Sequence, residues 1–260
     1  MKDAGFMQKK LILLILCITA GIFVSSCGLE TIISVNEPVS VYNAPLYSSD
    51  DYLTWYSEFA TNETGQDDAF LGTEIYYKIY NNYSNLNSHR SSILAVNTSS
   101  NSSAAATRMI ESYGYQTLGK SGNSDGWVFI PKKGDDGENR RVVIRLKNYQ
   151  DGTGYSSDSD RYNFAACVRI DGTYQSYIPY RNGNSKSFDF FDYDEDNKGG
   201  SRDVEPVEGD SDYYYNSTFP EENTYYVQLF AVGVANDSNT VSYSYSLVLD
   251  LGSVPIRKGE

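Results

Sequence analysis

The chain has 260 residues, which is enough for one large domain with a hydrophobic core or for two small domains. Hydrophobic residues make up 40% of the chain and charged residues 21%, and this balance excludes a chain that is disordered throughout. The formal net charge is −13 and the sequence shows no patch of basic residues, so the composition argues against binding to nucleic acid or to phosphate groups.

The first segment of the chain has the features of an export signal. Lys9 and Lys10 form a cationic start, residues 11–24 are mostly apolar, and small residues follow. Because this apolar stretch is too short to span a bilayer comfortably, we expect a cleaved signal peptide and not a permanent membrane helix.

The end of the signal, Val24-Ser25-Ser26-Cys27, resembles the lipobox of bacterial lipoproteins. The resemblance implies cleavage before Cys27 and attachment of palmitate-like acyl chains to it, and two or three such chains hold a protein durably on a membrane. An ordinary signal peptidase could also cleave here, which would leave Cys27 without lipid. Gly28 in place of Asp after the cysteine favours the outer membrane, at its periplasmic face or at the cell surface. The whole pattern is similar to lipoproteins of spirochaetes.

The rest of the chain shows no internal repeat and no clear internal boundary. We therefore predict one elaborated domain that follows the anchored N-terminus in the sequence. The predicted organisation is a signal peptide at 1–26, a lipid-anchored N-terminus and short tether at 27–35, a single β-sandwich domain at 36–254 and a C-terminal tail at 255–260.

Alternation of apolar and polar residues predicts β-strands along most of the chain. The predicted strands cover residues 53–59, 74–79, 141–146, 163–170 and 242–251. In the second of these, Ile75 and Tyr77 are expected to face the core and Tyr76 the opposite side. In the last, the odd-numbered residues from Tyr243 to Leu251 are expected to share one face.

One helix is predicted between the strands, over residues 104–113. Ser102 and Ser103 are candidate N-terminal caps, and Gly114 stands where a glycine commonly ends a helix. The helix is expected to cross over and to pack against a sheet. Residues 85–91, which include His89, have the composition of a polar loop.

The C-terminal part of the chain resembles the fibronectin type III fold. Residues 219–232 are similar to strand F of that family, and residues 242–251 and 72–80 then correspond to strands G and C. The resemblance implies that Tyr225 is a tyrosine corner, whose hydroxyl group binds back to the preceding turn. The predicted fold class is mainly β, an elaborated immunoglobulin/fibronectin III-like antiparallel sandwich with one short crossover helix. Such folds host many functions, so the likeness does not indicate an activity.

Few residues are suited to catalysis. Once Cys27 carries lipid, Cys167 is the one remaining cysteine of the mature chain, which excludes an internal disulfide, and in a strand it is expected to behave as a small hydrophobic residue. His89 is the one histidine available to a Ser-His-Asp or Cys-His mechanism, and its polar surroundings favour a solvated side chain. We therefore predict that the protein is not an enzyme.

One acidic segment has the spacing of a calcium loop. Asp192, Asp194 and Asp196 fall at positions 1, 3 and 5 of an EF-hand-like loop, and Asp203 falls at position 12. Asn197 stands where such a loop needs glycine, so an acidic surface loop without metal is the alternative. No other cofactor is predicted.

These features predict an exported, membrane-anchored lipoprotein whose sandwich binds a protein or glycan of the cell envelope or has a structural role. Tyrosines such as Tyr76, Tyr80 and residues 213–215 are expected either to form an exposed contact face or to pair across strands. A carbohydrate-binding module with a flat aromatic platform is one alternative. A glycoside hydrolase is another, and it needs two carboxylates across a cleft.

Overall fold

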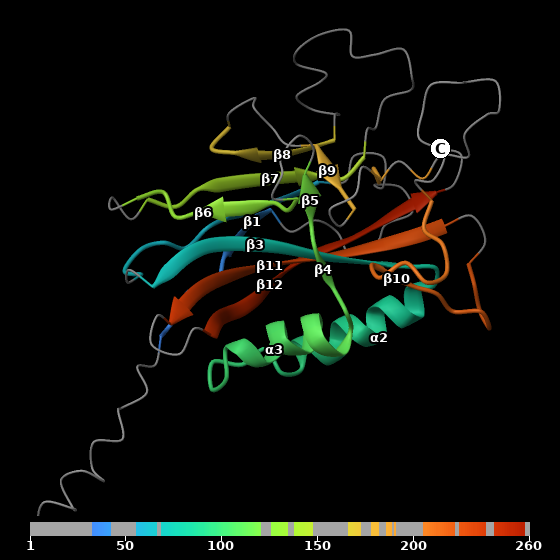
Figure 1. The fold of residues 1–260 in the computed structure, drawn as a ribbon, viewed down its shortest axis with the longest axis horizontal. Coiled ribbons are helices and arrows are strands. Elements are labelled where there is room, and N and C mark those ends of the chain that lie inside the picture. The colour runs from blue at the N-terminus through green and yellow to red at the C-terminus, as the bar shows by residue number, and fades with distance from the viewer. Residues whose placement is uncertain are drawn as a thin grey trace, which may run out of the picture. The chain divides into compact units, whose positions relative to one another are not determined.

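A computed structural model describes residues 33–42, 56–66, 69–120, 126–134, 138–147, 166–172, 178–181, 186–188, 190, 205–221, 224–237 and 242–257. This part of the chain is mainly β, and most of its strand pairs are antiparallel, which confirms the predicted fold class (Figure 1). It contains two α-helices, whereas the sequence predicted one.

Two sheets form the sandwich in the described residues. The smaller sheet contains, in spatial order, β1 (Val39–Tyr42), β2 (Ser57–Ala60), β7 (Arg141–Arg145) and β8 (Cys167–Ile170). The larger sheet contains β10 (Tyr213–Tyr214), β3 (Phe70–Tyr80), β11 (Thr224–Asp237) and β12 (Ser242–Arg257), with β4 (Gln116–Thr117) and β6 (Phe129–Pro131) also paired to β3. A separate pair joins β5 (Gly119–Lys120) to β9 (Pro179–Tyr180). The order β3–β11–β12 is the order that the likeness to strands C, F and G implies.

The larger sheet is buried on both faces. One face packs against the smaller sheet around Phe59, Ile75, Tyr77, Ile144 and Leu229. The other face packs against the two helices, as Figure 1 shows, through an apolar cluster that contains Tyr76, Tyr80, Leu86, Ile93, Met109, Tyr115, Phe230 and Val248. The molecule therefore has a helical layer below the sandwich, and this layer buries side chains that alternation alone assigned to a solvent face.

One edge of β3 is covered by three short strands from different parts of the chain. β11 pairs with β3 along its whole length, and on the opposite side β6 pairs with residues 72–74, β4 with residues 76–77 and β10 with residues 79–80. The β10 pairing is parallel, while the other two are antiparallel. Each of these covering strands has two or three residues.

β12 changes the face that its alternate residues present, and here the sequence prediction was wrong. The odd-numbered Tyr245 packs on the helical side, whereas the odd-numbered Leu251 lies in the core between the sheets. The pairing with β11 shifts twice, between Val232 and Val234 and again after Leu229, and each time β12 contributes an extra residue. Such a β-bulge reverses the inside-outside alternation of the strand beyond it.

Gly233 lies at the first bulge, where the segment before β1 approaches β11 closely. The backbone N–H of Gly233 donates to Ser246 Oγ at 2.8 Å, and Ser246 is fully buried. A Cβ atom on Gly233 would lie 2.8 Å from the Asn36 carbonyl oxygen and 3.0 Å from Val35 Cγ1. The glycine therefore lets the segment before β1 pack directly onto β11.

The predicted crossover helix is present, with a different geometry. It consists of α3 (Ser103–Thr107) followed by a π-helical turn, η1 (Arg108–Ser112), and it ends at Gly114 with a positive φ of 62°, as predicted for this glycine. Ser102 occupies the N-cap position but its side chain makes no capping bond, and the Ser103 hydroxyl donates instead to the Tyr245 carbonyl. Within the described residues, neither helix is long and apolar enough to cross a membrane.

The other helix, α2 (Tyr83–Leu94), occupies the segment that was predicted to be a polar loop. Asn82 caps it, because the Asn82 side chain accepts a hydrogen bond from the backbone N–H of Asn85 at 3.1 Å. Only Leu86 and Ile93 are buried along α2, two turns apart on one face. This apolar signal is too sparse for a periodicity argument, and tertiary packing determines the helix.

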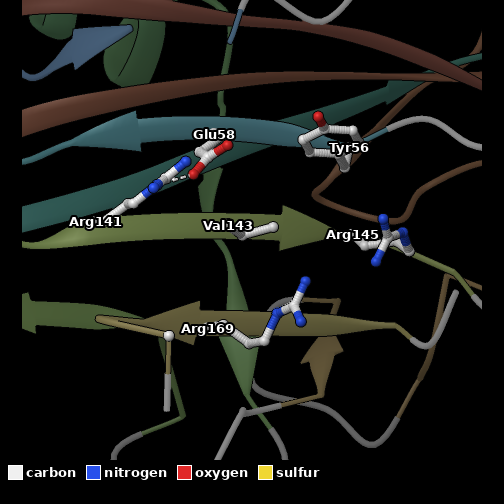
Figure 2. A pocket seen from close by; sticks show the side chains of 7 residues that line it. Tyr56, Glu58, Arg141, Val143, Arg145 and Arg169 are labelled. Atoms are coloured by element: carbon white, nitrogen blue, oxygen red, sulfur yellow. Dashed lines mark hydrogen bonds and ion pairs between the residues drawn. The ribbon is translucent and has the colours of Figure 1, made fainter. Parts of the chain in front are cut away.

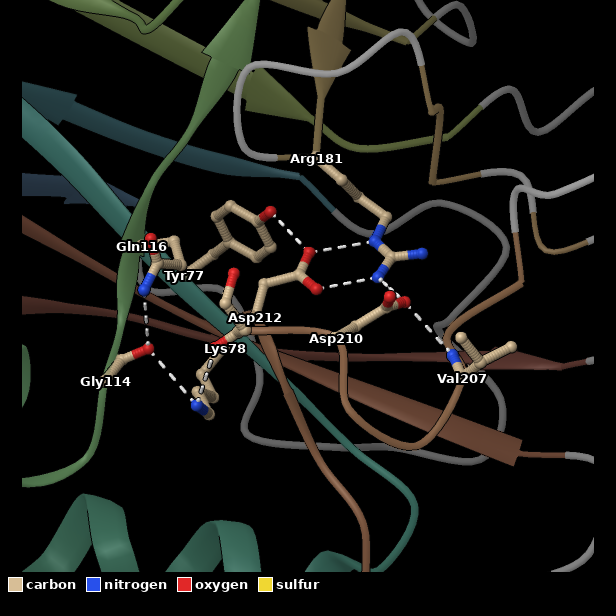
Figure 3. A network of polar contacts seen from close by, with 9 residues as sticks. Tyr77, Lys78, Gly114, Gln116, Arg181, Val207, Asp210 and Asp212 are labelled. Atoms are coloured by element: carbon tan, nitrogen blue, oxygen red, sulfur yellow. Dashed lines mark hydrogen bonds and ion pairs between the residues drawn. The ribbon is translucent and has the colours of Figure 1, made fainter.

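A buried polar network fastens the segment before β10 to β3 (Figure 3). The Arg181 guanidinium donates to both Asp212 carboxylate oxygens, through Nε at 2.8 Å and Nη2 at 2.7 Å, and it also donates to Asp210. The Tyr77 hydroxyl donates to Asp212 Oδ2 at 2.6 Å. Burial opposes the charge of Arg181, but the hydrogen bonds to Asp212 and Asp210 raise the pKa of the guanidinium, so it stays charged.

Candidate anion-binding site

A hollow of about 350 Å³ lies on the face of the smaller sheet that points away from the larger sheet (Figure 2). Alternation along β2, β7 and β8 places Phe59, Ile144 and Val168 in the core, and their neighbours therefore point to the other face. The hollow is lined by Tyr56, Glu58, Arg141, Val143, Arg145, Arg169 and Gly172.

Strand register brings these residues together. Val143 on β7 pairs with Glu58 on one side and with Arg169 on the other, so these three form one row across the sheet. Arg145 and Arg141 stand two residues to either side of Val143 on the same face. The hollow therefore has an apolar floor at Val143, with arginine side chains on three sides of it.

The described lining carries three guanidinium groups and one carboxylate. Arg141 forms an ion pair with Glu58 across β7 and β2. Arginine is almost never fully buried unless it is paired, and Arg145 and Arg169 are only 6% and 5% exposed. Arg145 lies against Tyr56, with its Cζ atom 5.5 Å from the centre of the ring, where the face of the ring attracts a cation. The chain is acidic overall, yet this hollow is locally cationic.

Cys167 stands beside the two buried arginines. It pairs with Arg145 across β7 and β8 and is itself buried, as predicted for a lone thiol in a strand. Burial raises the pKa of the Cys167 thiol, while hydrogen bonds and the positive charges of Arg169 and Arg145 act in the opposite direction. Arg145 and Arg169 thus approach one sulfur atom, which shows that their side chains converge.

This arginine cluster was missed in the sequence, where no basic patch could be found. Arg141 and Arg145 were assigned correctly to the side of their strand opposite Val142 and Ile144, and Arg169 to the polar side of its own strand. Which strands are neighbours, and in what register, cannot be read from alternation. Three scattered arginines therefore looked like separate surface charges until the β2–β7–β8 pairing joined them.

The other predicted site residues are not brought into this hollow. Cys27, the predicted lipidation site, lies outside the described residues, and so do Asp192, Asp194, Asp196 and Asp203 of the predicted calcium loop. Within the described part of the chain, no cluster of three or more histidine, cysteine, aspartate or glutamate side chains is arranged to hold a metal ion.

The predicted tyrosine contact face is only partly exposed. Tyr76 and Tyr80 are buried under the helices, at 6% and 0% exposure, because the larger sheet is covered on both faces. Tyr214 and Tyr215 are exposed, and the rings of Tyr213 and Tyr215 are tilted by 49° to each other. These rings form pairs and do not form a flat platform.

His89 lies on α2 in a cluster of tyrosines and not in a solvated loop. Its ring stacks on Tyr113 at 4.2 Å between centroids and meets the ring of Tyr214 edge-on at 4.8 Å. His89 Nδ1 shares a hydrogen bond of 3.2 Å with the Tyr80 hydroxyl, which donates in turn to the Tyr115 hydroxyl at 3.2 Å. Burial and the nearby charge of Lys78 lower the pKa of His89 below its ordinary value of 6.5.

This lowered pKa predicts a pH-dependent loss of stability. Folding favours neutral His89, so the unfolded chain takes up a proton first as the pH falls below 6.5, and the free energy of unfolding decreases until the pH passes the lowered folded-state pKa. Replacing His89 with glutamine is expected to remove this part of the pH dependence. Urea unfolding of both proteins between pH 7.5 and pH 5 measures it, and parallel curves would contradict the prediction.

Comparison of the chain with protein-family models, with curated protein sequences and with solved structures finds no match.

Proposed function

We propose that the chain is an exported lipoprotein of the bacterial cell envelope, tethered to the outer membrane through Cys27, and that its β-sandwich binds an anionic ligand without catalysis. The observation that carries the binding part is the convergence of Arg141, Arg145 and Arg169 in one hollow. Guanidinium groups pair with carboxylate, sulfate and phosphate oxygens through two parallel hydrogen bonds. With three cations and one carboxylate, the described lining is suited to holding an anion and not to acid–base chemistry that uses two carboxylates.

The anchor rests on the lipobox-like sequence before Cys27. Labelling cells with a palmitate analogue is expected to label the wild-type chain and not Cys27→Ala, because the thiol of Cys27 carries the acyl chains. Cys167→Ala is the matched control, and it should be labelled like the wild type, since the Cys167 thiol is buried. Equal labelling of Cys27→Ala and wild type would remove the anchor from the proposal.

Small anions test the hollow. Citrate and sulfate, compared with chloride at equal ionic strength, are expected to raise the Tm of the full chain in detergent, because a ligand that binds the native state stabilises it. The rise in Tm should be smaller in the double variant Arg145→Gln/Arg169→Gln. It should also be smaller in Arg141→Gln, which is a milder change because the Arg141 side chain is 65% exposed.

The variants separate site binding from general salt effects, since sulfate stabilises many proteins by exclusion from their surface. Lys133→Gln removes one positive charge, as Arg141→Gln does, and it is the control because Lys133 lies outside the hollow in an exposed ion pair with Glu138. The proposal fails if the Tm of the arginine variants rises as much as that of wild type and Lys133→Gln.

A further inference from the structure

We propose that a second face of the molecule, built by β5, β9 and residues 126–128, binds a neutral β-1,4-linked oligosaccharide that stacks on Trp127 and Tyr180. This face is distinct from the arginine hollow, whose described lining includes neither aromatic residue. The inference therefore goes beyond the proposed function. It follows from the register of three short segments, from the direction in which their side chains point, and from the uncharged character of the outward side chains.

Strand register places the two aromatic residues in one row. Gly119 on β5 pairs with Tyr180 on β9, and on its other side it forms an antiparallel β-bridge with Trp127 (Figure 1). Two backbone hydrogen bonds between residues 118–120 and 126–128, of 2.6 and 3.2 Å, flank the bridge and fix its register. Residues that pair directly across a sheet point to the same face. Trp127, Gly119 and Tyr180 therefore share one face.

That face points away from the core. Leu118 and Val128, the neighbours of Gly119 and Trp127 in the chain, are buried in the core between the sheets. Arg181, which follows Tyr180, is buried in the polar network with Asp212. Because successive side chains of a strand alternate between its two faces, the aromatic row points outward. Trp127 is 41% exposed and Tyr180 is half-buried.

The spacing of the two rings suits every second unit of a sugar chain. Trp127 and Tyr180 flank β5, so their Cα atoms are two strand spacings apart, about 10 Å. Gly119 stands between them and contributes no side chain to the space that separates the rings. In a β-1,4-linked chain each unit is turned over relative to the one before, so the first and third units present the same face and stand about as far apart. A trisaccharide therefore reaches both rings.

The chemistry of this face selects a neutral ligand with apolar surfaces. Its outward side chains are uncharged, although the chain as a whole has a net charge of −13. Ile178, two residues before Tyr180, adds apolar surface and is 45% exposed. The C–H face of a sugar ring packs on an aromatic ring, while the indole N–H of Trp127 and the hydroxyl of Tyr180 are polar groups suited to sugar hydroxyls. An incoming peptide cannot pair with β5 as a strand, because β5 already has a neighbour on each side.

Calorimetric titration of the full chain with sugars of increasing length tests the inference. The probes are the mono-, di- and trisaccharides of two β-1,4-linked series, of glucose and of N-acetylglucosamine. In one of these series the trisaccharide is expected to bind about tenfold more tightly than the disaccharide, because only the trisaccharide stacks on both rings. The series that binds more tightly identifies the sugar. Since the chain has two tryptophans, a change of fluorescence on sugar binding in Trp55→Phe locates the sugar at Trp127.

Variants assign the binding to the two rings. Tyr180→Leu keeps an apolar side chain and is expected to lower the trisaccharide affinity about tenfold, to the level of the disaccharide. Trp127→Ala should lower it by at least as much, and the exposure of Trp127 makes a loss of folding unexpected. Tyr243→Ala removes an exposed tyrosine on β12 and should bind like wild type, as should Arg169→Gln in the arginine hollow.

Three results would overturn the inference. Equal affinities for di- and trisaccharides in both series would contradict the two-ring site, and so would a Tyr180→Leu protein that binds the trisaccharide like wild type. A decaproline peptide that binds more tightly than either trisaccharide would make the occupant a proline-rich chain. Failure of all the sugars to bind would remove the site. In each case the anion-binding proposal still depends on the response of Tm to citrate and sulfate, so the two proposals fail separately.

Discussion

Replacing Asp212 with alanine is expected to lower the free energy of unfolding by about 3–5 kcal/mol, because it leaves a charged guanidinium buried without its main counterion. Arg181 is 1% exposed and directs two hydrogen bonds to Asp212. The Tyr77 hydroxyl loses its acceptor in the same variant. Urea unfolding followed by tryptophan fluorescence measures the loss.

Two milder changes in the same network serve as controls for Asp212→Ala. Asp210 is 22% exposed at its side chain, so Asp210→Ala is expected to cost less, because water can replace part of what Arg181 loses. Tyr77→Phe removes one hydrogen bond and keeps the ion pair, for a loss of about 1 kcal/mol. In addition, Arg181→Leu/Asp212→Leu should be more stable than Asp212→Leu alone, since it also removes the buried guanidinium that has lost its two hydrogen bonds to Asp212. An Asp212→Ala protein no less stable than Asp210→Ala would show that the buried charge pair does not control stability.

Replacing Phe230 with alanine is expected to cost about 3–5 kcal/mol as well, through the cavity left in the cluster between β11 and the helices. Phe230 is fully buried, and its ring packs on Tyr115 at 5.5 Å between centroids. Far-UV and near-UV circular dichroism during thermal unfolding should report one shared transition at a lower Tm, because β11 belongs to both apolar cores.

The matched change on the other side of the sandwich is Phe59→Ala, which removes an equally buried ring from the core between the sheets. It should lower the same transition by a similar amount. Tyr243→Ala is the surface control, since Tyr243 is 62% exposed, and its effect should stay within about 0.5 kcal/mol. If the far-UV and near-UV signals of Phe230→Ala are lost at different temperatures, the two apolar cores do not unfold in one shared transition.

The sequence was informative where structure is local. Alternation located β3, β7 and β12 and gave the correct inner face for Ile75, Tyr77 and Ile144, because a strand with one core-facing side has a period of two. Gly114 marked the end of the crossover helix, since a left-handed residue there favours glycine. These predictions depend on backbone geometry and on residues close to each other in the chain.

What could not be predicted depends on distant contacts. The bulges in β12 arise from its pairing with β11, so the reversal between Tyr245 and Leu251 has no local signal. The helical layer that buries Tyr76 includes α2, whose polar sequence forms a helix largely through packing. The tyrosine-corner prediction for Tyr225 fails for the same reason. The Tyr225 hydroxyl donates to the Glu205 carboxylate, twenty residues upstream, and not to the preceding turn. The arginine hollow required the register of three strands.

The short strands along β3 have a consequence for how this chain meets copies of itself. An uncovered edge as long as β3 would offer a row of free amide and carbonyl groups on which another molecule could extend the sheet, the first step towards fibrils. β4, β6 and β10 divide that edge into three pieces of two or three residues, one of them running in the opposite direction to the other two. No piece is long enough to template an incoming strand. A chain with 24 tyrosines benefits from such protection wherever its copies meet at high local concentration.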